Sequence, residues 1–321
     1  MPRIDATLAL ADRLGMWKVR WGIGRLKYMV PPGLYAIGVP AADSPVLVTA
    51  NYKMSFDIVR SALAGRNAWL LVLETYGINV WCAAGKGTFG TEELVRRIEV
   101  SGLVRVVTHR RLILPILGAP GVAAHEVAKK TGFTIRYAAL RAVDLPEYLD
   151  NGMVTTPAMR EMTFTVRERL ALIPVELVGA LKPTALAAVL LFIIAAALRG
   201  PALALTAVYA YLGAVVAGAA VVPLFLPWLP GRSFAGKGVL TGLAWIAVFY
   251  LLVGGEGWSA SVTAAAFLSL PAVSAFYALN FTGCTTFTSR SGVKKEMRIT
   301  LPAMGCTLIV SILVLLAGRF L

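Results

Sequence analysis

The chain has 321 residues, of which 58% are hydrophobic and only 15% charged, and its mean hydropathy is +0.73. Because about 25% of the residues in an average soluble domain are charged, this composition excludes an ordinary soluble enzyme, and its high apolar content excludes a disordered chain. Lys and Arg (31) outnumber Asp and Glu (17) by 14, an excess that an apolar chain does not need for solubility.

The two halves of the chain differ in composition. Residues 1–183 contain 23 basic and 15 acidic side chains, as in a globular domain, whereas residues 184–321 contain eight and two. Charged residues, among them Arg3, Asp5, Asp12 and Arg13, interrupt the first apolar stretch, so it does not resemble a secretory signal. We therefore expect a cytoplasmic domain at residues 1–165, a linker at 166–183 and a membrane domain at 184–321.

Short apolar runs alternate with amphipathic runs in the first half. The runs predict strands at 45–50, 69–74, 78–81, 104–108 and 133–137, and helices at 55–63, 91–100 and 122–131. This alternation is typical of an α/β fold with a mostly parallel sheet and covering helices. Ligands gather at the carboxyl ends of such strands. The candidate binding residues at these ends are Thr49, Asn51, Thr108 and His109. For His109 the stronger alternative is a polar residue at a strand end with its hydrogen bonds satisfied within the chain.

Five apolar runs in the second half predict an all-α bundle of five transmembrane helices. They cover residues 184–198, 201–226, 239–253, 259–279 and 300–317. Basic residues are concentrated in the loops that would face the cytoplasm if the N-terminus is inside. These residues are Arg232, Lys237, Arg290, Lys294, Lys295 and Arg298, whereas Arg199 and Arg319 would lie outside. We expect a multi-pass protein of the cytoplasmic membrane with its C-terminus outside. A transporter is a weaker alternative, because the runs contain almost no ionisable residue.

The inventory of metal ligands is small. The cysteines are Cys82, Cys284 and Cys306, and the histidines are His109 and His125. No two cysteines have the C-x-x-C spacing, which argues against a disulfide framework and against a zinc or iron–sulfur site made by this chain alone. A redox metal would have to arrive within a cofactor or on a partner.

Residues 85–90 read GKGTFG and match the G-x-G-x-x-G pattern of dinucleotide-binding folds. That fold also needs an acidic residue about 20 positions further on, and residues 104–121 contain no Asp or Glu. A phosphate-binding loop fails as well, because Lys86 is followed by Gly87 and not by Ser or Thr. We therefore expect neither NAD nor ATP here, and no motif supports nucleic-acid binding despite the basic pI.

The same segment places one thiol beside residues with almost no side-chain volume. Cys82 is followed by Ala83, Ala84, Gly85, Lys86 and Gly87. Glycine and alanine let a broad, flat group approach the backbone, and a soft thiolate suits a transition metal. One thiol without a second ligand suits a metal already held by a macrocycle. The alternative is that Cys82 packs as a small buried hydrophobe, as free cysteines usually do.

Residues 79–87, NVWCAAGKG, resemble the signature of the corrinoid protein family of microbial mercury methylation (HgcA). The resemblance continues through residues 45–57, 87–94 and 117–127 and through the five apolar runs. The AAGK portion is also similar to the corrinoid domain of the corrinoid iron–sulfur protein of acetyl-CoA synthesis. That family lacks a cysteine at the position of Cys82 and lacks the membrane half.

The resemblance to the mercury-methylation family implies a base-off cobalamin with Cys82 as the lower axial ligand of its cobalt, on a helix that caps the lower face of the corrin. The residues implied to contact it are Asn79, Val80, Trp81, Cys82, Ala83, Ala84, Gly85, Lys86 and Gly87. The implied function is a membrane-anchored, corrinoid-dependent methyltransferase that transfers a methyl group to Hg(II). The alternative is a corrinoid methyl carrier of one-carbon metabolism that presents the methyl group to another enzyme.

The same resemblance implies partner proteins. A ferredoxin-like protein with two [4Fe–4S] clusters would donate electrons, and a folate-linked methyltransferase would supply the methyl group. The basic inner loops and the excess positive charge of the first half suit an acidic partner, although the positive-inside rule and solvation are the stronger explanation of these charges.

Overall fold

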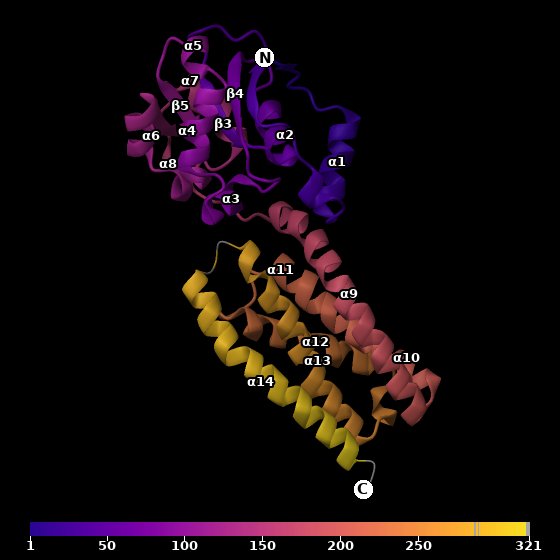
Figure 1. Ribbon diagram of the computed structural model, residues 1–321. Coiled ribbons are helices and arrows are strands. Elements are labelled where there is room, and N and C mark those ends of the chain that lie inside the picture. Colours follow the sequence, from indigo (N-terminus) through magenta and orange to yellow (C-terminus); the bar gives the residue numbers. More distant parts are fainter. Residues whose placement is uncertain (286, 288, 319–321) are drawn as a thin grey trace. The chain divides into compact units, whose positions relative to one another are not determined.

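The computed structural model describes residues 1–285, 287 and 289–318, and in it the chain divides into two compact units, Met1–Thr163 and a second that begins at Phe164. The first is an α/β unit and the second consists of long apolar helices (Figure 1). The predicted fold class is confirmed at this level. Residues 166–183, expected as a linker, form the first half of a long helix of the second unit.

The described part of the α/β unit contains one six-stranded sheet in the order β1-β2-β4-β3-β5-β6. All neighbouring strands are parallel except β2 and β4. The strands are β1 (Arg3–Ile4), β2 (Gly33–Ile37), β3 (Val46–Ala50), β4 (Ala68–Leu73), β5 (Arg111–Leu114) and β6 (Thr134–Tyr137). The helices are α1 (Leu10–Arg20), α2 (Lys53–Ala62), α3 (Val80–Lys86), α4 (Thr91–Val100), α5 (Leu103–Val106), α6 (Ala124–Thr131), α7 (Leu145–Asp150) and α8 (Pro157–Arg160), with short 3₁₀ turns η1 (Arg25–Lys27), η2 (Ile116–Gly121) and η3 (Ala142–Asp144).

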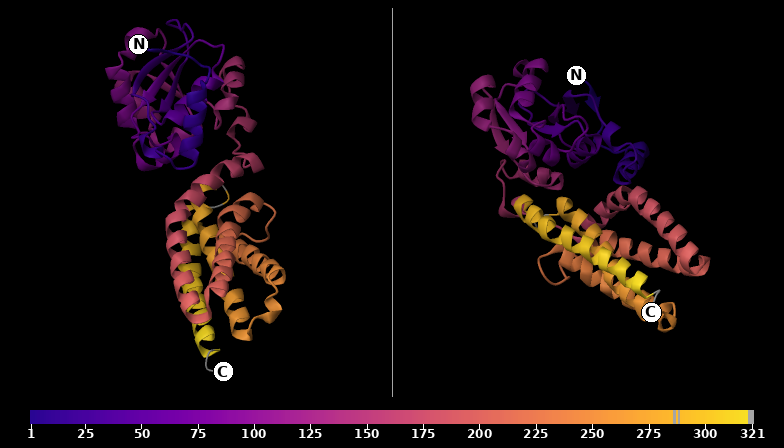
Figure 2. Two further views of the ribbon diagram at one scale, coloured as in Figure 1. Left: turned by 90° about the vertical axis from the view of Figure 1, so that its right-hand side faces the viewer. Right: turned by 60° about the horizontal axis from the view of Figure 1, so that its bottom comes forward.

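Two hydrophobic cores cover the two faces of this sheet. Alternate residues of a strand point to opposite faces, so Val46 and Val48 of β3 join the core under α3, α4 and α6, whereas Leu47 joins the core under α2, α7 and α8. Figures 1 and 2 show helices on both faces of the sheet. Strands buried on both faces are continuous apolar runs, which is why β3 and β4 were predictable from the sequence.

Two predicted strands are wrong. Residues 78–81 lead into helix α3, because the Asn79 side chain accepts a hydrogen bond from the Cys82 amide and caps the helix. Residues 104–108 contain the single turn α5, which begins after Gly102 in the left-handed conformation (φ 62°). The strand of this region, β5, begins only at Arg111. In both places β-branched residues mimic a strand, and a local capping signal determines the structure.

The second unit contains five helical segments long and apolar enough to cross a bilayer, within the residues that the structure describes. They are α9 (Val166–Arg199), α10 (Pro201–Val216), which continues through the π-helical turn η4 (Ala217–Val221) into α11 (Val222–Phe225), α12 (Phe234–Leu252), α13 (Ala260–Asn280) and α14 (Arg290–Ala317), with the 3₁₀ turns η5 (Gly255–Gly257) and η6 (Phe281–Cys284). Arg319, expected on the outer side, lies outside the described residues.

Small residues let the membrane helices approach closely. A Cβ atom on Gly238 or Gly242 of α12 would collide with the backbone of Ala275 or Pro271 of α13, as expected for helices packed through small residues. Lys237, predicted in a cytoplasmic loop, lies instead within α12, where its ammonium group donates a hydrogen bond to the Leu226 carbonyl oxygen (2.5 Å). The second unit therefore contains a buried lysine side chain near the N-terminal end of α12.

Candidate functional site

Helix α3 carries the residues that the sequence singled out, and its two ends are fixed by local chemistry. Asn79 caps the first turn through its side-chain oxygen, 2.9 Å from the Cys82 amide nitrogen. Gly87 ends the helix in the left-handed conformation (φ 82°), which favours glycine. Cys82 thus lies in the first turn of a seven-residue helix that begins close to the carboxyl edge of β4.

One face of helix α3 is buried and the other is exposed. Val80, Ala83 and Ala84 point into the core, and the other face exposes four residues: Trp81, Cys82, Gly85 and Lys86. A Cβ atom on Gly85 would meet no atom within 4 Å, so the surface beside the thiol is open. The exposure of Cys82 contradicts the alternative of a buried structural cysteine. The thiol instead lies on an exposed surface, between Trp81 and Lys86 in the sequence.

The turn η2 supports α3 from the buried side. A side chain on Gly121 would collide with the Phe89 carbonyl oxygen and would lie 3.0 Å from the Cα of Ala84, and one on Gly118 would strike the Phe89 ring. Both glycines therefore permit the close approach of two backbone segments. They therefore lie behind the helix, on its buried side.

Asn51 organises the loop that leads from β4 to α3. Its side-chain oxygen accepts hydrogen bonds from the Thr75 amide (3.1 Å), the Thr75 hydroxyl (2.8 Å) and the Gly77 amide (3.2 Å). Its side-chain nitrogen donates to Glu74 (2.6 Å). Asn51 is buried, so these contacts hold the loop against the end of β3. We predicted Asn51 as a ligand contact, and the structure uses it to position the residues before α3.

Glu93 of α4 completes this support. Its carboxylate accepts a hydrogen bond from the Glu74 amide (2.8 Å) and forms ion pairs with Arg96 and Arg97. Burial alone would raise the pKa of Glu93, but the Glu74 amide and the two guanidinium groups outweigh it and lower that pKa. The carboxylate therefore stays ionised and keeps the loop after β4 in place.

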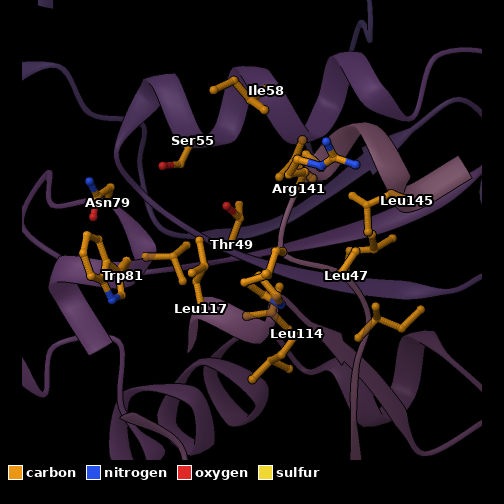
Figure 3. A pocket seen from close by; sticks show the side chains of 18 residues that line it. Leu47, Thr49, Ser55, Ile58, Asn79, Trp81, Leu114, Leu117, Arg141 and Leu145 are labelled. Carbon is orange, nitrogen blue, oxygen red and sulfur yellow. The ribbon is translucent and has the colours of Figure 1, made fainter. Parts of the chain in front are cut away.

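A partly open cavity of about 280 Å³ lies at the carboxyl edge of the sheet, on the face covered by α2 (Figure 3). The chain leaves β3 for β4 through α2, and it reaches β5, on the other side of β3, through α3, α4 and α5. The strand order therefore reverses at β3, where open α/β sheets form a ligand crevice. β3 and β5 are in register only at Leu47 and Ile113, so the crevice opens beyond that pair.

Thr49 provides a buried polar group in this mostly apolar cavity. Its hydroxyl is buried and has no hydrogen-bond partner among the described residues. Such a group costs free energy unless a ligand or water satisfies it. In Figure 3 the Thr49 and Ser55 hydroxyl groups lie on the cavity side of β3 and α2. Thr49 is therefore a strong candidate for ligand contact.

The cavity and the thiol are neighbours, because Asn79, Val80 and Trp81 line the cavity and Cys82 follows directly. Sequence reasoning missed the rest of the lining, which includes Ser55 and Ile58 of α2, Leu117 of η2 and residues 139–142. These residues come from three separate segments and carry no shared motif. Only their positions after strands β3, β5 and β6 gave a signal.

Thr108 and His109 do not join the other candidates. They precede β5, and their partners, the carbonyl oxygens of Ala42 and Ser44, precede β3. They therefore lie at the amino edge of the parallel strands, opposite the edge that holds Thr49 and Cys82. Their expected place at the ligand edge was based on the incorrect strand at 104–108.

The described residues contain no group of three or more His, Cys, Asp or Glu side chains placed to hold a metal ion. Cys306 is in α14, far along the chain from Cys82, and the side chain of Cys284 lies outside the described part. The open thiol face and the adjoining cavity suit a flat metal macrocycle with a smaller appendage. The cavity is too small for a whole corrin, but it has room for a group the size of a nucleotide base.

Comparison with known proteins shows that part of the α/β unit is similar to subunits of acetyl-CoA enzyme complexes. The sequence model of the family described as CO dehydrogenase/acetyl-CoA synthase delta subunit matches residues 25–140. The acetyl-CoA decarbonylase/synthase complex subunit gamma of Methanopyrus kandleri is 35% identical over 123 residues, and that of Methanocaldococcus jannaschii is 34% identical over 124. Subunit gamma 2 of Methanosarcina mazei is 40% identical over 90 residues.

These matches are confined to part of each protein. They cover 38%, 38% and 27% of this chain and 26%, 25% and 19% of the relatives, respectively, so the chain spans about a quarter or less of the relatives' length. The residues matched by the family include Thr49, Asn51 and all of α3, and they end before the membrane helices. The family and these relatives are named for acetyl-CoA chemistry and not for mercury methylation.

Proposed function

We propose that this chain is a membrane-anchored corrinoid protein that carries a methyl group on cobalt and delivers it to an acceptor. The observation that carries the proposal is the exposed thiol of Cys82 on the open face of α3, beside a cavity at the reversal of strand order. The match of residues 25–140 to subunits of acetyl-CoA enzyme complexes supports it.

Each residue of the site has a role in this proposal. Cobalamin, when bound, supplies the cobalt centre that carries the methyl group. The Cys82 thiolate would be a soft ligand for that metal, and its negative charge would make the cobalt centre a better donor of the methyl group. Gly85 leaves room for a flat ring, and Lys86 pairs with polar groups at its rim.

The adjoining cavity supports the base-off form. If Cys82 occupies the lower position, the nucleotide tail of the cofactor needs a separate place. The cavity offers apolar walls for a base, and it offers the hydroxyl groups of Thr49 and Ser55 for its polar atoms. Asn51 and Glu93 act through the loop before α3 and are positioning residues.

The comparisons favour a methyl carrier of one-carbon metabolism, whose acceptor is the active site of another enzyme. As a methyl carrier, the chain would act together with partner proteins. A ferredoxin-like protein with two [4Fe–4S] clusters would reduce the metal, and a folate-linked methyltransferase would supply the methyl group.

A second acceptor, Hg(II), is favoured by Cys82 itself. The segment NVWCAAGKG at residues 79–87 has the form found in mercury methylation, and the structure leaves its thiol exposed. An anionic thiolate ligand from Cys82 would suit methyl transfer to a soft electrophile. The chain would then be a corrinoid-dependent methyltransferase of the cytoplasmic membrane, with its α/β unit in the cytoplasm.

The decisive first test compares the full chain with Cys82→Ala and with Cys306→Ala as the matched control. All three are purified anaerobically in detergent and loaded with cobalamin. We expect a thiolate-ligated corrinoid spectrum for the wild type and for Cys306→Ala, and loss of that spectrum for Cys82→Ala. An unchanged spectrum in Cys82→Ala would rule out the ligand role of Cys82. Absence of bound corrinoid from the wild type would rule out the whole proposal.

A second experiment separates the two acceptors. The methylated, corrinoid-loaded chain is incubated with Hg(II), and methylmercury is measured by mass spectrometry. If methylmercury forms, and forms more slowly with Cys82→Ala than with the wild type, the result supports Hg(II) as the acceptor. A chain that keeps its methyl group in the presence of Hg(II), but passes it to an acetyl-CoA synthase, supports the carrier reading.

A further inference from the structure

The N-terminal helix α1 presents its apolar residues to the outside. Leu10, Leu14, Trp17 and Trp21 recur at helical spacing and fall within an arc of about 60° on the helix surface. All four are exposed, Leu10 at 73% and Trp17 at 67%. The apolar surface continues past the helix through Ile23, Leu26 and Met29, which are exposed as well. Contiguous apolar surface of this kind is typical of an interaction site.

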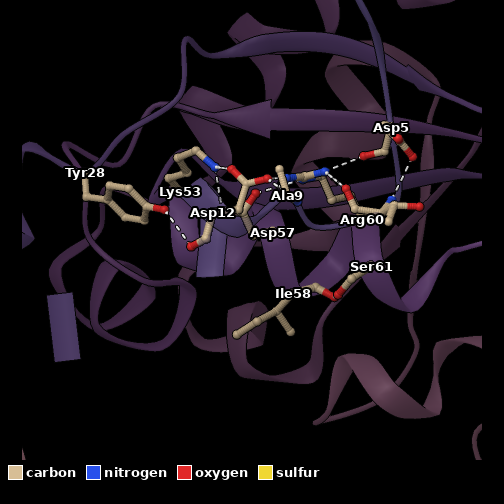
Figure 4. A network of polar contacts seen from close by, with 10 residues as sticks. Asp5, Ala9, Asp12, Tyr28, Lys53, Asp57, Ile58, Arg60 and Ser61 are labelled. Carbon is tan, nitrogen blue, oxygen red and sulfur yellow. Dashed lines mark hydrogen bonds and ion pairs between the residues drawn. The ribbon is translucent and has the colours of Figure 1, made fainter. Parts of the chain in front are cut away.

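A charge network fixes the opposite face of α1 (Figure 4). The Asp12 carboxylate binds Lys53 and Arg60 of α2 at 2.6 Å each, and Asp57 binds the same two cations at 2.7 and 2.8 Å. Arg60 also donates hydrogen bonds to the carbonyl oxygens of Asp5 and Thr7. The hydrogen bond with Lys53, and after it that with Arg60, lowers the pKa of Asp12 to about 2, so the network stays ionised at neutral pH.

The orientation of α1 is therefore the reverse of an ordinary amphipathic helix. Its acidic residue, the small Gly15 and the buried Val19 face the α/β unit, and its leucines and tryptophans face away from it. Gly15 packs against the Tyr28 ring with no room for a side chain. The contacts of Asp12 and Gly15 hold the helix in place without covering its apolar residues. The exposure of these residues is therefore determined by the fold.

Basic residues flank the apolar stripe. Arg13 and Arg20 lie roughly 70 to 90° to one side of it and Lys18 lies about 70° to the other. Arg25 and Lys27 follow in η1. A helix with Trp and Leu on one face and Lys or Arg at its borders lies in the plane of a membrane interface, where the long basic side chains reach the headgroups. Trp in particular concentrates at that interface.

The same chain contains five helices long and apolar enough to cross a bilayer. Insertion of these helices would tether α1 to the lipid surface, and tethering raises the effective concentration of a second contact, so a weak apolar face is enough for binding where the linking chain lets it reach the lipid. We propose that the exposed face of α1, with residues 23–29, docks in the plane of an anionic bilayer surface. This inference does not depend on the bound cofactor.

The docked segment is joined directly to the candidate site. The Val30 amide donates a hydrogen bond to the Asn51 carbonyl oxygen (2.9 Å), and the Lys53 amide donates to that of Tyr28 (2.9 Å). Met29 and Leu26 pack against Gly77, in the loop that Asn51 organises. Contact of α1 with lipid would therefore fix the carboxyl edge of the sheet relative to the membrane surface.

The test uses tryptophan fluorescence of the full chain in lipid nanodiscs. Wild type and Trp17→Phe/Trp21→Phe are reconstituted in an equal mixture of phosphatidylcholine and phosphatidylglycerol, with ordinary or brominated acyl chains. Subtracting the spectrum of the variant from that of the wild type isolates the emission of the two α1 tryptophans. Brominated lipid quenches only indoles in contact with the acyl region, so we expect this difference emission to fall at least about twofold in brominated discs.

Trp69→Phe is the matched control, because Trp69 is on β4 and donates to Ala41 at the opposite edge of the sheet. Its difference emission should be the same in both discs. Equal emission of Trp17 and Trp21 in ordinary and brominated discs would overturn the proposal. A shift of that emission only on addition of an acidic protein would overturn it in favour of a protein partner. Equal quenching in phosphatidylcholine alone would overturn the preference for anionic lipid.

Discussion

Thr49 carries a buried hydroxyl group for which the described residues offer no partner. If a ligand satisfies this hydroxyl, replacing Thr49 by Val should have opposite effects on the two forms of the protein. The cofactor-free chain should gain about 1 kcal/mol, because an unpaired polar group disappears, whereas bound corrinoid should dissociate faster. Thermal unfolding and corrinoid retention on gel filtration measure the two effects.

Thr49→Ser keeps the hydroxyl and serves as the control for the Val variant, since it should retain the corrinoid like the wild type. A Val variant that unfolds at a lower temperature than the wild type in the cofactor-free form would contradict the prediction. It would mean that the hydroxyl has a partner within the folded chain.

For Asn51, the sequence predicted the position of the residue but not its role. Its position after a buried strand was enough to place it at the ligand edge. Its role was not predictable, because its partners Glu74, Thr75 and Gly77 belong to a loop more than 20 residues further along the chain. Such a hydrogen-bond set exists only after β3 and β4 have paired. The same holds for the cavity, whose lining comes from segments that no sequence motif connects.

Gly85 in α3 and Gly121 in η2 differ in the space available for an added side chain. Gly85 faces open space, so Gly85→Val should leave the stability of the chain unchanged or slightly higher, since Gly is among the poorest helix formers. The new side chain would occupy the surface beside Cys82, and we expect at least a roughly tenfold loss of corrinoid affinity, equivalent to about 1.4 kcal/mol. A visible-absorbance titration measures it.

Gly121→Ala is the contrasting variant. The added methyl group meets the Phe89 carbonyl and the backbone of Ala84, so this variant should lose roughly 1–3 kcal/mol of stability through overpacking. If Gly85→Val binds corrinoid as tightly as the wild type, the flat surface beside the thiol is not where the ring lies.

At the level of elements, sequence patterns predicted the central strands and failed at short, capped segments. β3 and β4 are apolar on both faces, so tertiary burial and local sequence agree. In α3 and α5 the residues favour a strand while the caps, Asn79 and Gly102, favour a helix. Strands β1 and β2 and helix α1 were not predicted, because β2 pairs with β4, which is more than 30 residues distant in sequence.

The α/β unit has a core of its own on both faces of its sheet. We therefore predict that a chain of residues 1–163 folds without the membrane helices. It should show a cooperative thermal transition by circular dichroism in a mild detergent that covers the α1 face. A chain of residues 1–140, close to the end of the family match, should not do so, since it lacks Leu145, Tyr148 and Met159 of the second core.

A non-cooperative transition for residues 1–163 would show that the α/β unit depends on the membrane helices. Cooperative folding of residues 1–140 would show that α7 and α8 are dispensable. The two chains share every residue of α3 and of the Asn51 contacts. Their comparison therefore separates the stability of the unit from the local structure of the site.

The charge network beneath α1 affects the electrostatic interaction between two copies of this protein. Asp12 and Asp57 cancel Lys53 and Arg60, so the network is electrically neutral. Residues 1–163 contain 20 basic and 13 acidic side chains, and the surplus of seven positive charges therefore lies outside the network. If the five apolar helices hold the chain in a bilayer, two copies within it would repel each other within a Debye length of about 8 Å. Crowding in that bilayer would then favour encounters with acidic neighbours over self-association.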